Sequence, residues 1–288
     1  MSLSDEQIRK IIEDTVKEIS GVGETSPAPT CWLCDDAESA IQAAKASQKQ
    51  LMKLSLEERG RLIEAMRVAA REQVNYLSEL AHTETGYGKV ADKIKKNLLA
   101  INKTPGVEDL TTSAMSGDFG LTLVECAPFG VIGSITPSTN PTSSVINNSI
   151  SMIAAGNAVV YNPHPAAKKA SIETMRILNE AIVKAGGPAA LICTVKNPTL
   201  ETGKYIMEHP DIPLLSITGG EAVVKVAMKT GKKVIAAGPG NPPVIVDDTA
   251  DIKKAAKDIV DGASFDNNVL CIAEKEVFAI SEIAEPLM

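Results

Sequence analysis

Apolar positions follow two different spacings along this chain, and the change between them divides it into regions. In residues 1–20, and again in residues 35–100, apolar side chains recur at helical intervals among charged ones, which predicts amphipathic helices. Asp36 is placed as a helix N-cap, and Ser55 with Glu58 has the spacing of a capping box. Residues 21–34 are rich in Gly, Pro, Ser and Thr, which is typical of a flexible linker.

After Pro105, short apolar runs alternate with longer helical stretches. The runs of strand length lie at residues 131–135, 158–161, 191–195, 214–217, 234–236 and 244–246. The helical stretches lie at residues 166–185, 199–208, 220–230 and 250–260. Continuous apolar strands separated by amphipathic helices predict an α/β fold, in which helices cover both faces of a parallel sheet.

Composition narrows the class of protein. Of the 288 residues, 44% are hydrophobic and 23% are charged, which is typical of a globular chain with an apolar core. The net charge is -7 and no block of Lys or Arg occurs, so we expect no nucleic-acid partner. No apolar run approaches the roughly 18 residues of a membrane span, and the acidic start of the chain is unlike a secretory signal. Five irregularly spaced cysteines do not suggest a disulfide framework, and we expect a cytoplasmic protein.

Cys31 and Cys34 have the spacing of a redox motif or of half a zinc site. No second Cys pair completes such a site, and the chain has only three histidines, so we expect no bound metal. The amphipathic helix of residues 1–20, with its tether, has two plausible uses. It docks in a groove of a partner protein, which we favour, or it folds back on its own domain. Its acidic residues and lack of aromatic anchors argue against a membrane surface.

Three loops that follow predicted strands are candidates for ligand binding. Thr218-Gly219-Gly220 opens a predicted helix, where glycines allow a pyrophosphate to approach backbone N–H groups; a simple tight turn is the alternative. Asn140 lies in a proline-stiffened loop at residues 136–142, which suits an amide that donates to an oxyanion, although a plain turn residue remains open. The loop at residues 237–243 is both rigid and able to pass close to a ligand.

Cys271 lies between a predicted helix and a predicted strand at residues 276–280. A lone Cys is most often an inert core residue, so spacing alone leaves both a structural and a catalytic role open.

Six segments, taken together and in this order, resemble the aldehyde dehydrogenase superfamily, in particular its CoA-acylating branch of propionaldehyde and acetaldehyde dehydrogenases. They are residues 125–133, 136–142, 162–165, 218–220, 238–241 and 265–271. The resemblance covers about residues 35–288. It implies a Rossmann-type parallel sheet with helices on both faces, a dinucleotide-binding domain at residues 35–240 with leading helices at 35–100, and the start of a catalytic domain at 241–288.

The resemblance also implies a role for each candidate residue. Cys271 becomes the nucleophile that forms a thioester, and the Asn140 amide holds the oxyanion together with the backbone N–H of Cys271. NAD is the implied cofactor, with coenzyme A as the acyl acceptor. The residues implied in cofactor binding are Thr136, Pro137, Ser138, His164, Thr218, Gly219, Gly220, Gly238 and Pro239.

Two departures from the family pattern are informative. Hydrolytic members carry a Glu general base that activates water, whereas residues 236–240 here contain no carboxylate, which favours a thiol acceptor. Semialdehyde dehydrogenases that reduce acyl phosphates also lack this Glu and remain an alternative. Family members continue well beyond the catalytic Cys, so we expect this chain to be the N-terminal part of such an enzyme, with apolar surface exposed where the rest packs.

The sequence therefore predicts an NAD-dependent oxidoreductase that converts propanal or acetaldehyde to acyl-CoA through a Cys thioester. A noncatalytic cargo fragment is a second alternative. Residues 1–20 resemble the encapsulation peptides of enzymes packaged in bacterial microcompartments. This resemblance implies a shell protein as partner and the microcompartment lumen as location, and we expect the complete enzyme to be a homo-oligomer.

Overall fold

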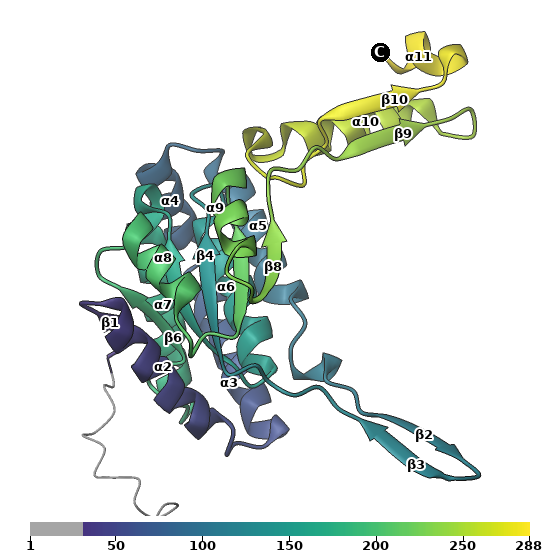
Figure 1. Ribbon diagram of the computed structural model, residues 1–288. Helices are drawn as coiled ribbons and strands as arrows, with labels where there is room; N and C mark the ends of the chain where they lie inside the picture. Colours follow the sequence, from purple (N-terminus) through teal and green to yellow (C-terminus); the bar gives the residue numbers. More distant parts are fainter. Residues whose placement is uncertain (1–30) are drawn as a thin grey trace, which may run out of the picture.

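Six parallel strands form the central sheet of the protein (Figure 1). The computed structural model describes residues 31–288; the helix predicted at residues 1–20 and most of the predicted linker lie outside them. The strand order is β1-β6-β5-β4-β7-β8. The strands are β1 (Leu33–Cys34), β4 (Val131–Thr136), β5 (Ala158–Pro163), β6 (Ile192–Val195), β7 (Leu214–Thr218) and β8 (Lys233–Ala237).

Helices cover both faces of this sheet, as the apolar strands require. The helices α6 (Pro141–Ala154) and α7 (Lys168–Lys184) connect β4, β5 and β6 in one direction along the sheet. The helices α8 (Leu200–Glu208) and α9 (Glu221–Met228) lead back to β7 and on to β8. Right-handed crossovers in opposite directions place these two helix pairs on opposite faces. The parallel α/β fold with helices on both faces is thus confirmed.

Four leading helices add a further layer. They are α2 (Ala37–Leu51), α3 (Leu56–Glu72), α4 (Val74–Thr85) and α5 (Val90–Lys103). α2 packs on the sheet beside α8, whereas α3 and α5 pack against α7 and α6 on the other face. Asp36 caps α2, and Ser55 with Glu58 forms the capping box of α3, both as predicted from the sequence.

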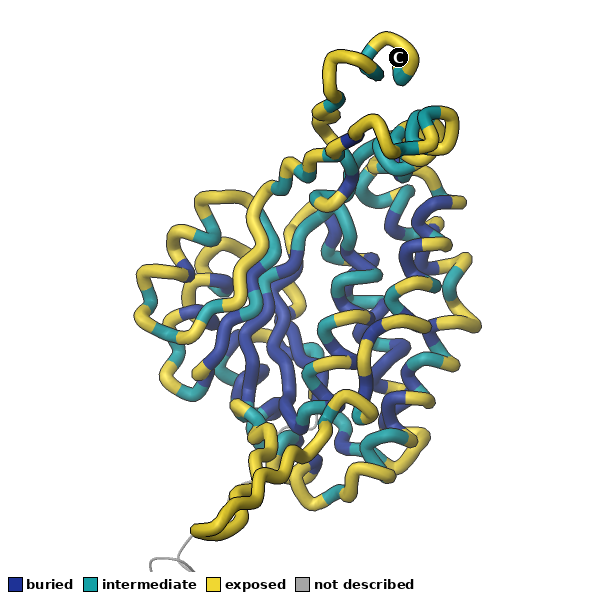
Figure 2. Tube along the Cα trace, turned by 90° about the vertical axis from the view of Figure 1, so that its right-hand side faces the viewer, coloured by how far each residue is buried: buried dark blue, intermediate teal, exposed yellow. Residues whose placement is uncertain are grey.

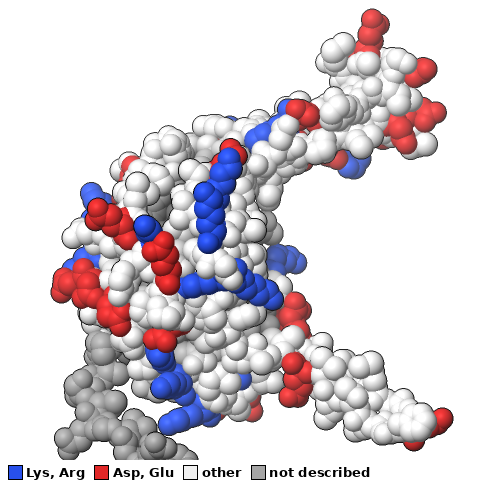
Figure 3. Space-filling model, in the orientation of Figure 1, with Lys and Arg blue, Asp and Glu red and all other residues white. Residues whose placement is uncertain are grey.

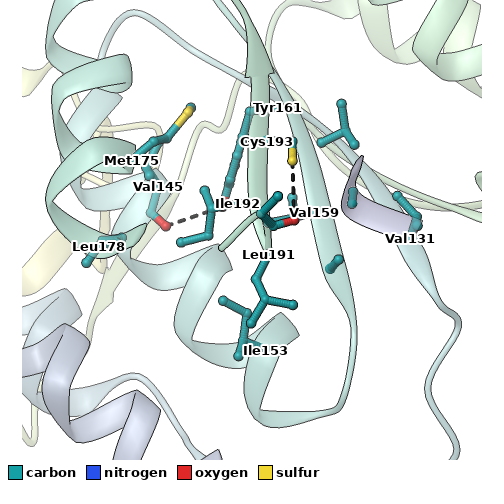
Figure 4. Close-up of a cluster of buried hydrophobic side chains, with 14 of the residues drawn as sticks. Val131, Val145, Ile153, Val159, Tyr161, Met175, Leu178, Leu191, Ile192 and Cys193 are labelled. Carbon is teal, nitrogen blue, oxygen red and sulfur yellow. Dashed lines mark hydrogen bonds between the residues drawn. The ribbon is translucent and has the colours of Figure 1, made fainter. Parts of the chain in front are cut away.

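The core lies between the sheet and the helices, and it is built from aliphatic residues. Figure 2 shows the buried residues concentrated along the strands and the inner helices. Tyr161 is its largest fully buried side chain, and its hydroxyl lies 2.9 Å from Ser149 Oγ. The same hydroxyl lies 3.3 Å from the Val145 carbonyl oxygen, to which it donates (Figure 4). Gly133 on β4 lies among Ile206, Ile212 and Leu215, where a Cβ would be crowded, and the absence of a side chain lets α8 pack closely on the sheet.

Two parts of the chain extend from this body (Figure 1). One is an antiparallel hairpin of β2 (Ser113–Gly117) and β3 (Gly120–Val124), all of whose residues are exposed. Its surface carries almost no charge (Figure 3), and its exposed apolar side chains are Met115, Phe119, Leu121, Leu123 and Val124. The other is a C-terminal arm of β9 (Pro243–Val246), α10 (Ile252–Ser264), the short helix η3 (Phe265–Asn268), β10 (Glu276–Ala279) and α11 (Ser281–Leu287).

Three details differ from the sequence-based expectations. Leu33 and Cys34, assigned to the linker, form the short edge strand β1 that pairs with β6. The strand predicted at residues 244–246 does not join the central sheet, because it pairs in parallel with β10 in the arm. The hairpin β2–β3 and the helix α6 were not predicted. The proposed boundary between the two domains near residue 240 remains a prediction, although the chain leaves the central sheet after β8.

Candidate functional site

Loops after four adjacent strands carry most of the residues predicted for the site. β4 and β5 end in register at Thr136 and Pro163, and β7 and β8 end in register at Thr218 and Ala237. Parallel strands present their carboxyl ends at one edge of the sheet, so the loops that follow converge there. β4 and β7 are neighbours, but the chain leaves them in opposite directions along the sheet. This is the switch point at which open α/β sheets bind ligands.

A cavity of about 440 Å³ lies at this switch point. All the site residues predicted from the sequence line it: Thr136, Pro137, Ser138, Asn140, His164, Thr218, Gly219, Gly220, Gly238, Pro239 and Cys271. The fold therefore brings these residues together from the loops after four strands and from the arm. Their individual roles remain predictions.

The glycine pair at the start of α9 suits a pyrophosphate. A Cβ added at Gly219 or Gly220 would meet no atom within 4 Å, so the backbone there faces open space. α9 has no side-chain cap at Gly220, which leaves N–H groups of its first turn for a ligand at the positive end of the helix dipole. Thr136 Oγ1 is buried with no hydrogen-bond partner among the described residues. These features fit a dinucleotide with a phosphate and a hydroxyl-bearing sugar.

His164 lies on the same cavity, directly after β5. Its Nδ1 accepts a hydrogen bond from the backbone N–H of Ala166 at 3.1 Å. In the neutral imidazole the proton then resides on Nε2, which is left as a donor. A donor at the cavity rim suits a sugar hydroxyl or a phosphate oxygen.

Asn140 ends the loop after β4 and directly precedes Pro141, the first residue of α6. Its Nδ2 donates to Thr139 Oγ1 at 3.0 Å, and its Oδ1 accepts from Lys96 Nζ at 2.8 Å. One amide hydrogen therefore remains for a ligand. Asn140 lines the first cavity together with Cys271.

A left-handed turn precedes Cys271. Asp266 and the two Asn residues after it have φ angles of 48°, 55° and 57°, in the region that Asp and Asn tolerate best among residues with a Cβ. The Asn268 amide closes the turn by donating to the carbonyls of Ala263 at 2.6 Å and Glu274 at 3.1 Å. The turn is thus held by side chains rather than by regular helix, and it leaves Cys271 half-buried at the cavity.

Gly240 joins this turn to the loop after β8. The carbonyl of Cys271 lies so close to Gly240 that any Cβ there would collide with it. Lys275 adds a backbone hydrogen bond to the Pro242 carbonyl at 3.1 Å. Position 240 therefore requires Gly, because the backbone passes close to the candidate nucleophile there.

A second cavity of about 430 Å³ meets the first at Asn140, Thr218, Leu270 and Cys271, which line both. Its other walls come mainly from α5 and α6, including Lys96, Leu99 and Asn147. Cys271 can therefore be approached from two sides. None of the described residues that line either cavity is Asp or Glu.

Sequence reasoning assigned no role to a buried ionic cluster beside the site. Asp266 is completely buried and accepts from Lys93 Nζ at 3.4 Å, from Lys96 Nζ, and from the backbone N–H of Lys89 at 2.8 Å. Burial lowers the pKa of Lys96, and the bond to Asp266 opposes that shift. The sequence contains little indication of this cluster. Lys93 and Lys96 are one turn apart on α5, but Asp266 lies far along the chain.

The Cys31–Cys34 pair does not form a disulfide. Cys34 Sγ lies 2.9 Å from the carbonyl oxygen of Cys31, and burial raises the pKa of Cys34 to about 12, which disfavours thiolate chemistry. Within residues 31–288 no cluster of His, Cys, Asp and Glu could hold a metal ion. The helices in that same range include none long and apolar enough to cross a membrane.

The sequence profile of the aldehyde dehydrogenase family matches residues 32–288. The chain belongs to the aldehyde dehydrogenase family. Among curated relatives, it is 48% identical to an acetylating acetaldehyde dehydrogenase of Bilophila wadsworthia, over 100% of this chain and 61% of the relative. It is 46% identical to a CoA-propanoylating propanal dehydrogenase of Salmonella typhimurium, over 96% of this chain and 61% of the relative.

Solved structures of the family agree with this fold. A propionaldehyde dehydrogenase from the fucose utilisation microcompartment of Clostridium phytofermentans superposes with a TM-score of 0.87 and 53% identity, covering 89% of this chain and 59% of that one. A propionaldehyde dehydrogenase of Rhodopseudomonas palustris, with bound CoA and an acylated cysteine, superposes with a TM-score of 0.86 and 48% identity, covering 89% and 59%. The chain thus spans about three fifths of the length of the relatives it matches.

Proposed function

We propose that the protein containing this chain is a CoA-acylating aldehyde dehydrogenase that oxidises a short-chain aldehyde, propanal or acetaldehyde, with NAD. The observation that carries the proposal is the meeting of Cys271 and the Asn140 amide at the junction of two cavities. The relatives named as acetylating or CoA-propanoylating enzymes support the choice of reaction.

The chemistry begins at Cys271. Its thiolate adds to the aldehyde carbon and forms a thiohemiacetal, whose oxyanion accepts hydrogen bonds from Asn140 Nδ2 and from the backbone N–H of Cys271. When bound, NAD supplies the acceptor for the hydride that leaves this carbon. Loss of hydride leaves an acyl thioester on Cys271. The thiol of coenzyme A, as thiolate, then attacks the thioester carbonyl, and the Cys271 thiolate departs.

The residues of this chain that would hold NAD belong to the first cavity. The backbone N–H of Gly220 and the first turn of α9 suit the pyrophosphate, whereas the Gly219 N–H already donates to the Ala237 carbonyl at 3.2 Å. Gly219, Gly238 and Pro239 border the same space. Thr136, Pro137, Ser138 and His164 line the same cavity. By the family resemblance, Thr136 and Pro137 would lie on the nicotinamide-ribose side and His164 near the adenosine ribose.

The choice of coenzyme A over water follows from the groups around Cys271. Activation of water requires a general base, and no carboxylate occurs among the described residues that line the two cavities. A thiol needs no such help near neutral pH. The same reasoning does not separate coenzyme A from phosphate, but the relatives named as CoA-acylating favour coenzyme A over an acyl-phosphate reaction or a noncatalytic cargo role.

The test uses the complete protein with propanal, NAD and coenzyme A. NADH formation should require coenzyme A and should be abolished by Cys271→Ala, while the variant retains its circular dichroism spectrum. Replacement of coenzyme A by phosphate should give no turnover. NADH formation that persists in Cys271→Ala refutes the proposed mechanism, and phosphate-dependent turnover favours the semialdehyde dehydrogenase alternative.

We also propose that residues 1–20 dock the enzyme to a microcompartment shell protein, that the enzyme acts in the microcompartment lumen of the cytoplasm, and that it is a homo-oligomer. The tethered amphipathic sequence supports the first two points, and the exposed apolar hairpin β2–β3 supports the third. Deletion of residues 1–20 should abolish co-purification with shell protein. Unchanged co-purification refutes the docking role.

A further inference from the structure

Asn140 occupies the N-cap position of α6, yet its side chain makes no capping hydrogen bond. Asn is among the best N-cap residues because its oxygen can accept from the first turn of the helix. Here the oxygen accepts from Lys96 Nζ instead, at 2.8 Å. The helix α6 therefore lacks a stabilising side-chain cap, and the Asn140 amide is held by Lys96 instead.

Lys96 determines which way the amide faces. An ammonium group has three donors and no acceptor, so the atom of Asn140 that it contacts must be the oxygen. The NH₂ group then lies on the opposite side of the amide, where one hydrogen reaches Thr139 Oγ1 at 3.0 Å and the other is free for the cavity. A cation on the oxygen also polarises the amide and strengthens its N–H groups as donors.

Lys96 is itself held in place by the turn that carries Cys271. Its side chain is only 7% exposed, and its Nζ also donates to the fully buried carboxylate of Asp266. Asp266 lies in the left-handed turn that precedes Cys271. One ammonium group therefore connects the amide at the start of α6 to the turn that places the nucleophile.

On the basis of the proposed function, we propose that Lys96 is a positioning residue for the reaction at Cys271. Its ammonium group holds the Asn140 amide with N–H toward the oxyanion and keeps that amide in a fixed place relative to the Cys271 turn. Lys96 itself does not contact the reacting atoms; it acts through Asn140.

The chain contains a matched control in Lys93. Lys93 lies one turn earlier on the same helix, is 3% exposed, and contacts the same Asp266 carboxylate at 3.4 Å. No hydrogen bond joins Lys93 to Asn140 among the described contacts. A merely structural role in neutralising Asp266 would be shared by both lysines, whereas positioning of the amide belongs to Lys96.

The experiment compares Lys96→Met and Lys93→Met in the complete protein. Each variant is acylated on Cys271 with ¹³C-carbonyl propionyl-CoA, in which the Cys271 thiolate takes the acyl group and the coenzyme A thiolate leaves. Difference infrared spectroscopy then reports the carbonyl stretch, which rises in frequency when a hydrogen bond to the oxygen is lost. In parallel, kcat and KM are measured with propanal.

Lys96→Met should raise the carbonyl frequency and lower kcat about tenfold with little change in KM, a smaller loss than the ~10²-fold expected when an oxyanion donor is removed. Lys93→Met should leave the frequency and kcat near wild type. Lys96→Met should have no further effect in an Asn140→Ala background, and Lys96→Arg should restore part of the wild-type frequency. If Lys96→Met does not fold, the carbonyl frequency of the acylated Lys96→Arg and Lys96→Gln variants tests the positioning role instead.

Equal effects of the two Met variants, or additive effects of Lys96→Met and Asn140→Ala, overturn the positioning role. An unchanged frequency in a folded, acylated Lys96 variant also overturns it. Wild-type protein that takes up no acyl group overturns the proposed function, and the positioning role with it; these failures are distinguishable because the wild-type reaction is measured first.

Discussion

Asp266→Asn removes the carboxylate that pairs with both Lys93 and Lys96. The Asp266 side chain is completely buried, and the two lysine side chains are 3% and 7% exposed, so water cannot replace the lost carboxylate. Asn can still accept from the backbone N–H of Lys89, which Asp266 contacts at 2.8 Å. Removal of one partner of a buried ion pair costs about 3–5 kcal/mol. We expect a loss of that size in the free energy of unfolding.

Urea unfolding followed by circular dichroism measures this loss as a lower midpoint at an unchanged m value. Asp258→Asn is the control, because Asp258 pairs with Lys254 on the exposed side of α10 and such surface pairs contribute at most about 1 kcal/mol. A midpoint shift for Asp266→Asn no larger than that of Asp258→Asn would refute the reasoning.

The pH dependence gives a second check. Burial lowers the pKa of Lys96 below its ordinary value of 10.5, and the bond to Asp266 opposes this shift, so the variant should lower that pKa further. Between the lowered pKa and 10.5 the unfolded chain binds more protons than the folded one, and the free energy of unfolding therefore rises with pH. The difference in free energy of unfolding between the wild type and Asp266→Asn should therefore narrow as the pH is raised from 7 toward about 10. A difference in free energy of unfolding that widens over this interval contradicts the claim that Asp266 raises the pKa of Lys96.

Three further predictions concern residues that line the first cavity. Asn140→Asp replaces the amide donor by a carboxylate and should lower kcat by about 10²-fold or more, as steady-state NADH formation will show; a kcat near wild type would exclude the oxyanion role. Gly240→Ala adds a Cβ against the Cys271 carbonyl and should displace the Cys271 turn, so that the rate of Cys271 alkylation by iodoacetamide changes while unfolding of the central sheet does not; an unchanged rate would show that the turn is not held there. Gly219→Val fills the open space before α9 and should weaken NAD binding in calorimetry without altering acylation of Cys271 by propionyl-CoA, and equal affinity for NAD would place the pyrophosphate elsewhere.

The inner strands of the central sheet were predictable because they are continuous apolar runs, and burial on both faces demands such runs. β4 and β5 are buried almost throughout, and both were recognised from their residues. The hairpin β2–β3 gave no comparable signal, since all of its residues are exposed and neither face requires a regular apolar pattern. The two-residue strand β1 is too short for any periodicity to be detected.

Part of the candidate site was likewise predictable from the sequence, and part was not. Residues in loops after strands were found because strand ends and family motifs both indicate them, and all of them line one cavity. The ionic cluster of Lys93, Lys96 and Asp266 was assigned no role because it depends on contacts across about 170 positions of sequence. Three consecutive residues with positive φ before Cys271 were also not predicted. Asp and Asn tolerate that conformation, but they occur in many other turns.

The identity of the residue that takes up the acyl group tests the account most directly. The complete protein is incubated with ¹³C-labelled propionyl-CoA without NAD, digested, and examined by peptide mass spectrometry. We expect a single labelled propionyl group on the peptide that contains Cys271, its removal on addition of free coenzyme A, and no label in Cys271→Ala. A label on Cys31, Cys126 or another residue, with Cys271 unmodified, would contradict the account.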